Sequence, residues 1–371
     1  MPRLKTRSLA LLIGTGLIAT YVLICVLNYR ADQQDIAGLN VLSALRQIYN
    51  ANQSVLPTQS TVILEPSPGL TCQDGGSGLY LLFIVISSPD NVGRRDVIRN
   101  TFHDMRQDWE TQYFGNGSAN GGIASGNTTK LFQMLFFVGQ TAENGISDGL
   151  RSEWERHGDV IVDDMQESYL NLTVKTLRML KWALHNCAEA NYLVKMDDDV
   201  YLNVPKLLTF LATNGNPLLV AGHRYNEVGV DRDPTSKWYT PPGLWHREKF
   251  PVFVAGFCYI MGMQAAAKMF AESRHVPLFH LEDVFLSGII GTERLNLELS
   301  QFGDIITMLE WYHYIKPVSW IRRKSIIHMV NDNQIRCWTR YTTTKELEEG
   351  PLSKNDSGSD WWLPLFFYYC M

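Results

Sequence analysis

The chain has 371 residues, of which 45% are hydrophobic, so it is long enough to bury one large core or two smaller ones. Its formal net charge is −5, with 33 Lys and Arg residues against 38 Asp and Glu residues. This balance argues against the basic surface that nucleic-acid binding requires, so we expect no nucleic-acid partner.

The first predicted element is residues 9–27, an apolar run without a charged side chain. As a helix it would be about 28 Å long, close to the thickness of the hydrocarbon core of a bilayer. Arg3, Lys5 and Arg7 precede it, which predicts a cytosolic tail (residues 1–8) and a single-pass type II membrane protein. A cleaved signal peptide is the alternative. We favour an uncleaved anchor, because the run is longer than a usual signal-peptide core and no small-residue cleavage pattern follows it.

Two features of the remaining chain agree with a lumenal location. N-x-S/T sequons, the acceptor sites for N-glycosylation, occur at Asn52, Asn116, Asn127, Asn171 and Asn355. Asn171 falls at the start of a predicted helix, where burial would leave it unmodified. Five of the six cysteines lie beyond the apolar run, and an oxidising lumen would permit disulfides among them with at least one thiol left over. Their spacing alone does not show which of them pair.

Composition divides the lumenal part into three segments. Residues 28–77 are rich in Gln, Asn, Ser and Pro and predict a stem. The catalytic domain is predicted to span residues 78–345. Residues 346–371 form a tail that is first acidic and then strongly aromatic, and we expect it to pack on the domain rather than span a membrane. Residues 115–129, rich in Gly, Asn and Ser, predict a surface insertion within the domain.

Short apolar segments alternate with helical patterns from Leu79 onward. Residues 79–86 form a continuous apolar run, as expected of a strand buried on both faces. Between residues 173 and 190, apolar side chains recur at helical spacing and predict a helix that faces the core. The alternation predicts an α/β fold with a Rossmann-like, mostly parallel central sheet flanked by helices. The other predicted strands are residues 131–138, 160–162, 192–196, 217–222 and 252–261.

Three consecutive carboxylates, Asp197, Asp198 and Asp199, follow the predicted strand at 192–196. In open α/β sheets, ligands collect at the carboxyl ends of the strands. Carboxylates crowded there repel one another unless they share a cation, and hard divalent ions bridge carboxylates to phosphate oxygens. The triplet therefore predicts a metal site that would neutralise a diphosphate leaving group. A solvated acidic turn is the alternative.

A second acidic pair, Glu282 and Asp283, precedes an apolar stretch. Acidic side chains in this position commonly cap the N-terminus of a helix. The functional alternative is a general base that takes a proton from an incoming hydroxyl group. From the local pattern alone, the helix cap is the better interpretation.

Three arginines, Arg94, Arg95 and Arg99, follow the first predicted strand. Guanidinium groups in this position would grip phosphate or nucleotide. They would equally form a solvated helix face, and their spacing does not distinguish the two.

In this order, several segments between Leu79 and Val330 resemble the β-1,3-galactosyltransferase and β-1,3-N-acetylglucosaminyltransferase superfamily, which includes the Fringe-like enzymes. Residues 94–102 resemble its R-x-x-I-R-x-T-W segment and residues 135–139 its second strand. Residues 157–175 resemble its G-D-I-I-x-x-D-F-x-D-S-Y-x-N-L-T-x-K signature. Residues 195–199 match its K-x-D-D-D motif, and residues 282–284 with Gly288 match its E-D-V motif.

The resemblance implies a GT-A fold, a manganese ion and inverting transfer from a UDP-sugar. It implies that Asp199 binds the metal directly, whereas Asp197 and Asp198 assist through water, ribose or neighbouring groups. A histidine near the C-terminus completes the metal site in this family. His328 is the best match by position, and His313 is the fallback.

The remaining site residues follow from the same resemblance. The catalytic base of the family falls on Asp283, and Arg94, Arg99 and Asp164 would lie against the nucleotide. The segments that shape the acceptor and donor-sugar pocket contain Lys237, Trp238, Gly256 and Glu282. Cys72 and Cys187 stand where relatives have a disulfide. The chain departs from the family at Phe102, Met165 and Glu167, where Trp, Phe and Asp are usual, and these changes affect packing more than chemistry.

We therefore expect a Golgi membrane enzyme, a hexosyltransferase that moves galactose from UDP-galactose to the 3-hydroxyl of a glycan on a glycoprotein or glycolipid. UDP-N-acetylglucosamine is the alternative donor, and a homo- or hetero-dimer is left open. A non-catalytic chaperone or lectin-like relative is the rival from another class, but both carboxylate motifs that such a protein would lose are intact. A metal-dependent hydrolase lacks its usual His-rich spacing here.

Overall fold

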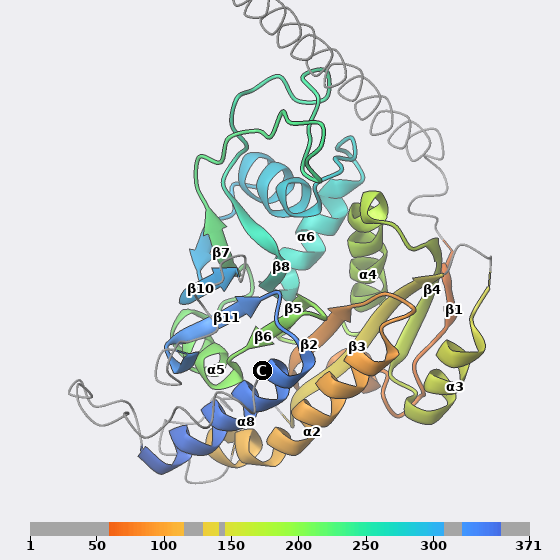
Figure 1. Cartoon of the computed structure of the whole chain (residues 1–371), viewed down its shortest axis with the longest axis vertical. Helices are drawn as coiled ribbons and strands as arrows, with labels where there is room; N and C mark the ends of the chain where they lie inside the picture. Colours follow the sequence, from red (N-terminus) through yellow and green to blue (C-terminus); the bar gives the residue numbers. More distant parts are fainter. Residues whose placement is uncertain (1–58, 115–128, 141–144, 308–320, 350–371) are drawn as a thin grey trace, which may run out of the picture. The chain divides into compact units, whose positions relative to one another are not determined.

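The computed structural model describes residues 59–114, 129–140, 145–307 and 321–349 (Figure 1). The predicted cytosolic tail, the anchor, most of the stem and the aromatic end of the tail lie outside these residues. So do His313 and the sequons at Asn52, Asn116, Asn127 and Asn355. Among the described residues, no helix has the length and apolar character needed to cross a membrane.

The chain divides into two compact units, which are described separately. The larger unit comprises the described parts of Gln53–Glu227 and Pro251–Met371, and the smaller described segment is Val228–Phe250.

A mixed eight-stranded sheet forms the centre of the larger unit, in the order β1-β4-β3-β2-β5-β8-β7-β9. Four of its pairings are parallel (β2–β3, β2–β5, β3–β4 and β7–β9) and three are antiparallel (β1–β4, β5–β8 and β7–β8). The expected mostly parallel sheet is therefore confirmed. The strand at 252–261 was predicted too, but the sequence did not show that this strand, β8, runs antiparallel to its neighbours. The strands are β1 (Val62–Leu64), β2 (Leu79–Ile86), β3 (Lys130–Gln140), β4 (Val160–Gln166), β5 (Tyr192–Asp197), β7 (Val220–Tyr225), β8 (Phe253–Gly262) and β9 (Leu299–Gln301).

Helices flank this sheet, and several of them pack in pairs. Helix α2 lies beside α8, and α4 lies beside α6 (Figure 1). The sheet and α2 share a core of edge-to-face aromatic contacts, in which the Phe102 ring meets Phe83, Trp109 and Phe132. The helices are α2 (Val92–Phe114), α3 (Asp148–His157), α4 (Leu172–Asn186), α5 (Val204–Asn214), α6 (Met263–Ser273), α8 (Asp332–Glu349), the short 3₁₀ turns η1 (Gln73–Gly76) and η2 (Tyr169–Asn171), and the π-helix η3 (Val284–Arg294).

The packed domain is longer than the predicted 78–345 at both ends. Strand β1 pairs with β4, opposing Val62 to Asp163, so part of the predicted stem belongs to the sheet. A disulfide with an S–S distance of 2.04 Å joins Cys72 to Cys187, the pair that the family resemblance implies. At the other end, α8 runs without a break through residue 345. The apolar run of β1, three residues long, was too short to separate from a linker by composition.

A second sheet of three strands holds part of the candidate site. It contains β10 (Asp304–Thr307), β11 (Lys324–His328) and β6 (Val200–Leu202) in the order β10-β11-β6. Strand β11 is antiparallel to β6, and its register opposes His328 to Val200. Since Val200 follows the aspartate triplet, this pairing brings a residue from near the C-terminus beside the end of β5.

The smaller unit, Val228–Phe250, is a loop closed by a bridge between Gly229 and Lys249. The guanidinium group of Arg232 organises its interior by donating to the carbonyl oxygens of Thr240 (2.6 Å) and Trp245 (2.7 Å). These contacts hold the irregular backbone of the loop, because they satisfy carbonyl groups that no strand or helix uses.

Candidate active site

Three potential metal ligands meet at the end of β5. One ligand atom each from Asp197, Asp199 and His328 lies within 4.8 Å of the other two. Asp197 ends β5, Asp199 lies in the following turn, and His328 ends β11. The His328 Nε2 atom lies 3.4 Å from Asp199 Oδ1, and the Val330 backbone N–H donates to the Asp199 carbonyl (3.0 Å). The structure thus brings together the two predicted ligands and adds Asp197.

The second carboxylate pair lies at the N-terminus of η3. Asp283 is the N-cap residue of this helix, and its Oδ1 accepts from the Val284 N–H (2.9 Å). Its Oδ2 accepts from the Gly256 N–H on β8 (3.0 Å). These two contacts orient the Asp283 carboxylate at the start of the helix, and they are compatible with a base, because each carboxylate oxygen keeps a further lone pair. π-Helical segments are also frequent at functional sites.

Glu282 differs from its neighbour in being almost completely buried, with 3% of its surface exposed. The Tyr259 hydroxyl donates to its Oε1 (2.7 Å), whereas its Oε2 has no hydrogen-bond partner among the described residues. A Cβ atom added at Gly256 would lie 3.0 Å from Glu282 Oε2 and 3.3 Å from Asp283 Cβ. Position 256 therefore requires glycine for this close approach of β8 to the acidic pair.

A series of hydrogen bonds connects the two groups of carboxylates. The buried Lys195 ammonium donates to Asp197 Oδ1 (2.6 Å) and to the Gly256 carbonyl oxygen. The Gly256 N–H in turn donates to Asp283. We call the set Asp197, Asp199, Glu282, Asp283 and Lys195 the carboxylate site. The sequence contained Lys195 in a motif but gave no reason to assign it this bridging role.

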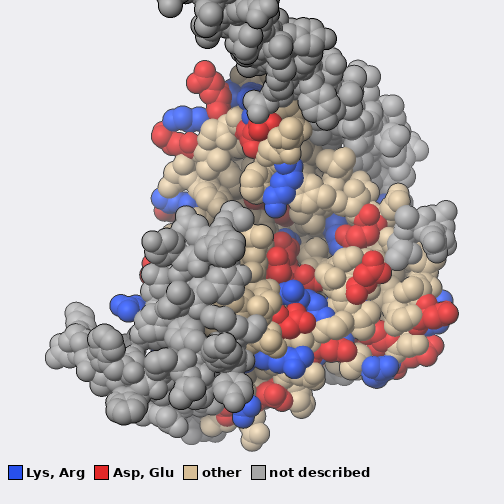
Figure 2. Space-filling model, in the orientation of Figure 1, with Lys and Arg blue, Asp and Glu red and all other residues tan. Residues whose placement is uncertain are grey.

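The carboxylate site has more negative than positive charge, and the pKa values of its members reflect this. Burial, assisted by the charges of Asp283 and Asp197, raises the pKa of Glu282 to about 7. Burial also raises the pKa of Asp283, against the hydrogen bonds from Val284 and Gly256. Burial would raise the pKa of Asp199 too, but the hydrogen bond and charge of His328 hold it below its usual value. Figure 2 shows acidic and basic side chains gathered at the middle of the face drawn, over the region of β5 and β2.

Asp198 points to a different set of partners from the rest of the triplet. Its Oδ2 accepts from the Ser87 hydroxyl (2.7 Å) and from the Asn91 amide (2.9 Å), both in the connection from β2 to α2. Arg94 lies nearby, donating to the Val330 carbonyl (2.6 Å) and pairing with Asp332 (2.6 Å). Asp198 and Arg94 therefore border the carboxylate site, and their contact with a nucleotide stays a prediction.

Arg99 is placed differently from Arg94. It forms, with Arg95, Glu153 and Asp159, a buried group that we call the arginine cluster. Its guanidinium nitrogens bind Glu153 (2.5 Å) and both oxygens of Asp159 (2.7 and 2.8 Å). Arg95 binds Glu153 through two nitrogens (2.8 and 2.6 Å). These contacts are those of a structural residue, so we do not carry Arg99 into the nucleotide site.

The contacts of the other predicted residues do not indicate a role in the site. Asp164 is exposed and forms an ion pair with Arg178 (2.5 Å). Lys237 and Trp238 belong to the smaller unit, where the Lys237 ammonium lies 4.7 Å from the centre of the Trp238 ring and 48% of Trp238 is exposed. Asn171 is partly buried before α4, and its amide donates to the Gln166 carbonyl (3.1 Å).

Tyr169 is a residue of the site that the sequence did not single out. It lies in η2 with 47% of its surface exposed. Its pKa is raised to about 12, first by loss of solvent around the hydroxyl and then by the charges of Asp283, Asp197 and Glu282. Its hydroxyl therefore lies within electrostatic reach of both carboxylate groups. The quoted signature at 157–175 contained this tyrosine but carried no sign of its position.

The donor set at the end of β5 fits a divalent ion such as manganese. It offers two carboxylates and one imidazole, and this mixture of oxygen and nitrogen ligands suits a first-row transition metal. Lys195 occupies only one oxygen of Asp197, which leaves the other available. A bound cation would also offset the excess negative charge of the carboxylate site.

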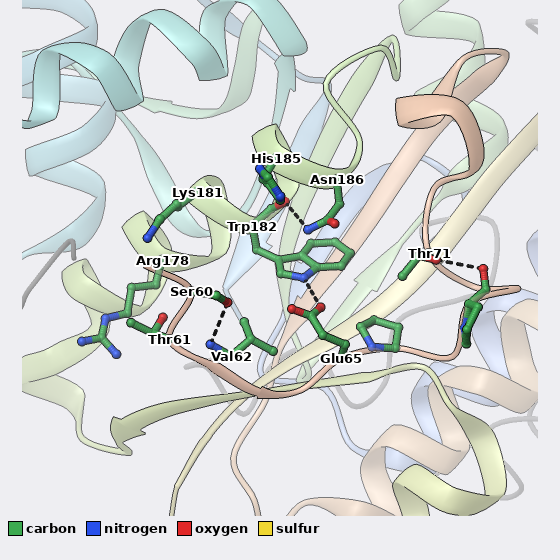
Figure 3. A pocket seen from close by; sticks show the side chains of 12 residues that line it. Ser60, Thr61, Val62, Glu65, Thr71, Arg178, Lys181, Trp182, His185 and Asn186 are labelled. Atoms are coloured by element: carbon green, nitrogen blue, oxygen red, sulfur yellow. Dashed lines mark hydrogen bonds between the residues drawn. The ribbon is translucent and has the colours of Figure 1, made fainter. Parts of the chain in front are cut away.

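A separate pocket of about 500 Å³ lies elsewhere in the larger unit (Figure 3). The 59–71 segment and α4 line it, and the Trp182 indole N–H donates to Glu65 across its floor (2.7 Å). None of the residues of the carboxylate site lines this pocket, so its volume gives no support to a catalytic role.

Comparison with known proteins identifies relatives of this chain. A family model described as galactosyltransferase matches residues 93–301, a segment that contains both groups of carboxylates. Human β-1,3-galactosyltransferase 2 is 28% identical over 279 residues, covering 72% of this chain and 60% of the relative. Mouse β-1,3-galactosyltransferase 1 is 34% identical over 219 residues, covering 57% of this chain and 64% of the relative. Rat β-1,3-galactosyltransferase 4 is 29% identical over 264 residues, covering 63% and 65%.

Solved structures are more distant. A glycosyltransferase involved in the glycosylation of the major capsid of PBCV-1 is 8% identical and covers 70% of this chain, with a TM-score of 0.35. A TM-score this low carries no argument. The description of the fold therefore relies on the topology of the chain itself.

Proposed function

Because this chain belongs to the galactosyltransferase family, we propose that it transfers a sugar from a UDP-sugar to the 3-hydroxyl of an acceptor glycan, with a divalent metal and inversion to a β linkage. We propose galactose as the sugar, since the relatives described above are β-1,3-galactosyltransferases. The match spans about 60% of the length of human β-1,3-galactosyltransferase 2, so substrate and product remain part of the proposal.

The observation that carries this proposal is the hydrogen-bond series from Asp197 through Lys195 and Gly256 to Asp283. It links a candidate metal site on β5 to a candidate base at the start of η3 through the neighbouring strand β8. Sugar transfer needs this combination, because negative charge leaves with the diphosphate while a proton must leave the attacking hydroxyl.

Asp283 would act as the base in a single displacement. The acceptor oxygen forms a bond to the anomeric carbon, the bond from that carbon to the UDP oxygen breaks, and its electron pair leaves with UDP. The hydroxyl proton moves to a carboxylate oxygen of Asp283. The two backbone N–H groups that bind Asp283 fix the orientation of the carboxylate, which keeps a lone pair directed at the hydroxyl.

The other residues of the site would bind and orient. Asp199, His328 and Asp197 would hold a manganese ion, which supplies positive charge for the departing diphosphate. Arg94 and Asp198 would contact the nucleotide at the border of the site. Tyr169, whose side chain is partly exposed, would contact one of the two sugars.

We also propose a Golgi location, with the anchor at residues 9–27 in the membrane and the catalytic domain in the lumen. The disulfide between Cys72 and Cys187 supports an oxidising compartment. Acceptors carried by glycoproteins or glycolipids agree with this location. Epitope tagging at each end of the full chain, followed by protease protection of isolated Golgi vesicles, tests it. A protected C-terminal tag supports the proposed orientation, and an accessible one contradicts it.

The activity is tested by incubating the purified full chain with UDP-galactose or UDP-N-acetylglucosamine and a panel of β-linked acceptors, with MnCl₂ or with EDTA. We expect transfer from UDP-galactose that EDTA abolishes and that the Asp199→Asn variant lacks. Transfer from UDP-N-acetylglucosamine alone would correct the donor. A folded chain that neither transfers sugar nor binds UDP would point to the non-catalytic relative and contradict the proposal.

A further inference from the structure

Within the described part of the chain, no hydrogen bond from the second ring nitrogen orients the His328 imidazole. Its Nε2 faces Asp199 at 3.4 Å, whereas its Nδ1 is buried and has no hydrogen-bond partner among the described residues. Histidines that bind metals almost always donate their other ring N–H to a carboxylate, a carbonyl or water, and this contact sets the angle of the ring. Another contact must therefore perform this task for His328.

The neighbouring residue that meets the imidazole face is Phe257. The centres of the two rings are 4.4 Å apart, and their planes differ by 17°, which is a stacked arrangement. Contact over the whole ring face restricts rotation about the Cβ–Cγ bond of the histidine, because any large rotation drives the imidazole edge into the phenyl ring.

Phe257 is itself held firmly enough to serve as a support. It lies within β8, which pairs with β5 on one side and β7 on the other. Only 8% of its surface is exposed, and its neighbour Cys258 is fully buried. Gly256, the preceding residue, is bound on both its N–H and its carbonyl group by the carboxylate site. The backbone that carries Phe257 is therefore one of the most constrained parts of the site.

We propose that Phe257 is the positioning residue of the metal site, whose ring holds the His328 imidazole at the angle that directs Nε2 toward the ion shared with Asp199. The inference rests on the proposed metal site and adds to it a residue that touches neither metal nor substrate. An aromatic ring here replaces the polar second contact that orients histidine ligands in other metal sites.

Direct metal binding tests this inference without using sugar transfer. The full chain is titrated with MnCl₂, and free Mn²⁺ is measured by electron paramagnetic resonance. Loss of an orienting contact typically weakens metal binding 10- to 100-fold. We therefore expect Phe257→Leu, which keeps apolar volume but removes the flat face, to raise the Kd at least about tenfold. Phe257→Tyr keeps the ring and should stay within about twofold of the wild type.

Two further variants separate positioning from general packing. In a His328→Ala background, Phe257→Leu should cause no additional loss, because the ring it supports is gone. Phe132→Leu removes a ring from the aromatic core beside Phe83 and Trp109, and it should leave the Kd unchanged. If Phe257→Leu does not fold, as judged by its thermal unfolding, Phe257→Met fills the space with a flexible side chain and carries the same expectation.

The outcomes distinguish failure of this inference from failure of the metal site. Wild-type binding by the Phe257→Leu and Phe257→Met variants, together with weak binding by His328→Ala, would overturn the role of Phe257 alone. Equal losses from Phe257→Leu with and without His328 would also overturn it, because they would show a packing effect. Absence of Mn²⁺ binding by the wild type, or unchanged binding by His328→Ala, would overturn the metal site and this inference with it.

Discussion

The arginine cluster and the carboxylate site are two groups of charges in the larger unit that differ in their balance of positive and negative charge. In the arginine cluster, two guanidinium groups meet Glu153 and Asp159, and Arg99 also pairs with the partly exposed Asp96 (2.7 Å). Glu153 alone accepts from both Arg95 and Arg99. In the carboxylate site, one ammonium group faces four carboxylates, and Glu282 Oε2 has no partner among the described residues. Buried charges that the protein balances are structural, whereas an excess of one sign indicates that a ligand supplies the rest.

The pKa values show the same contrast. Burial would raise the pKa of Glu153, but hydrogen bonds and charge from Arg95 and Arg99 outweigh it and lower the pKa. Burial raises the pKa of Glu282 to about 7, and Lys195 does not outweigh it. The protein's own arginines stabilise Glu153 as an anion, whereas the surroundings of Glu282 do not stabilise its charged form.

The largest expected effect is on catalysis at the carboxylate site. Asp283→Asn removes the proposed base but keeps an oxygen for the backbone N–H groups. We expect kcat to fall by about 10²–10⁴-fold, with UDP affinity nearly unchanged, because general-base catalysis contributes a factor of this size. Steady-state kinetics and equilibrium UDP binding measure the two quantities. Near-normal activity of this variant would remove Asp283 from the mechanism.

The arginine cluster should respond in stability instead. Glu153→Gln leaves two buried guanidinium groups without their shared anion, and we expect the free energy of unfolding to fall by about 3–5 kcal/mol. Denaturant unfolding of the full chain measures it. The matched control is Glu110→Gln, which removes an exposed ion pair with Arg106 and should cost no more than about 0.5 kcal/mol. Equal losses from the two variants would contradict the structural role of the cluster.

The pH dependence of stability should distinguish Glu282 from ordinary carboxylates. Its pKa is about 7 in the folded chain and near 4.5 when unfolded, so folding favours its protonated form. This contribution is fully present below pH 4.5 and is lost as the pH rises through 7. At about 1.4 kcal/mol per pH unit, the loss is on the order of 3 kcal/mol relative to Glu282→Gln.

Denaturant unfolding of the wild type and of Glu282→Gln, both in EDTA between pH 4.5 and pH 8, provides the measurement. Parallel pH profiles for the two proteins would show that Glu282 titrates normally in the folded chain.

The smallest expected effect comes from Gly256, which lies against the Glu282 and Asp283 side chains. Gly256→Ala forces a methyl group to 3.0 Å from Glu282 Oε2, and overpacking of this kind costs about 1–3 kcal/mol of unfolding free energy. Activity should fall about tenfold, because Asp283 is displaced from its backbone partners. Gly93→Ala is the control, since a methyl group added there meets no atom within 4 Å. Full activity of Gly256→Ala would show that this contact tolerates movement.

Local patterns predicted much of this protein. Mostly apolar runs predicted β2, β3 and β5 within a few residues, because a strand buried on both faces has few polar positions. The aspartate triplet and the acidic pair were recognised as candidate site residues, because carboxylates at the end of a strand can bind a cation and carboxylates at the start of a helix can cap it. The antiparallel direction of β8 was missed, since an apolar run does not show which way a strand points.

By itself, the sequence determined the fold class and the residue types of the site, and the anchor stays a prediction. Only the tertiary structure decided how they act. It separated Arg94 from Arg99, linked Lys195 to Asp197 and to the Gly256 carbonyl, and set His328 beside Asp199 and Phe257. The physical reason is that strand and helix patterns depend on neighbours in sequence, whereas charge balance and ring stacking depend on groups that folding brings together from distant parts of the sequence.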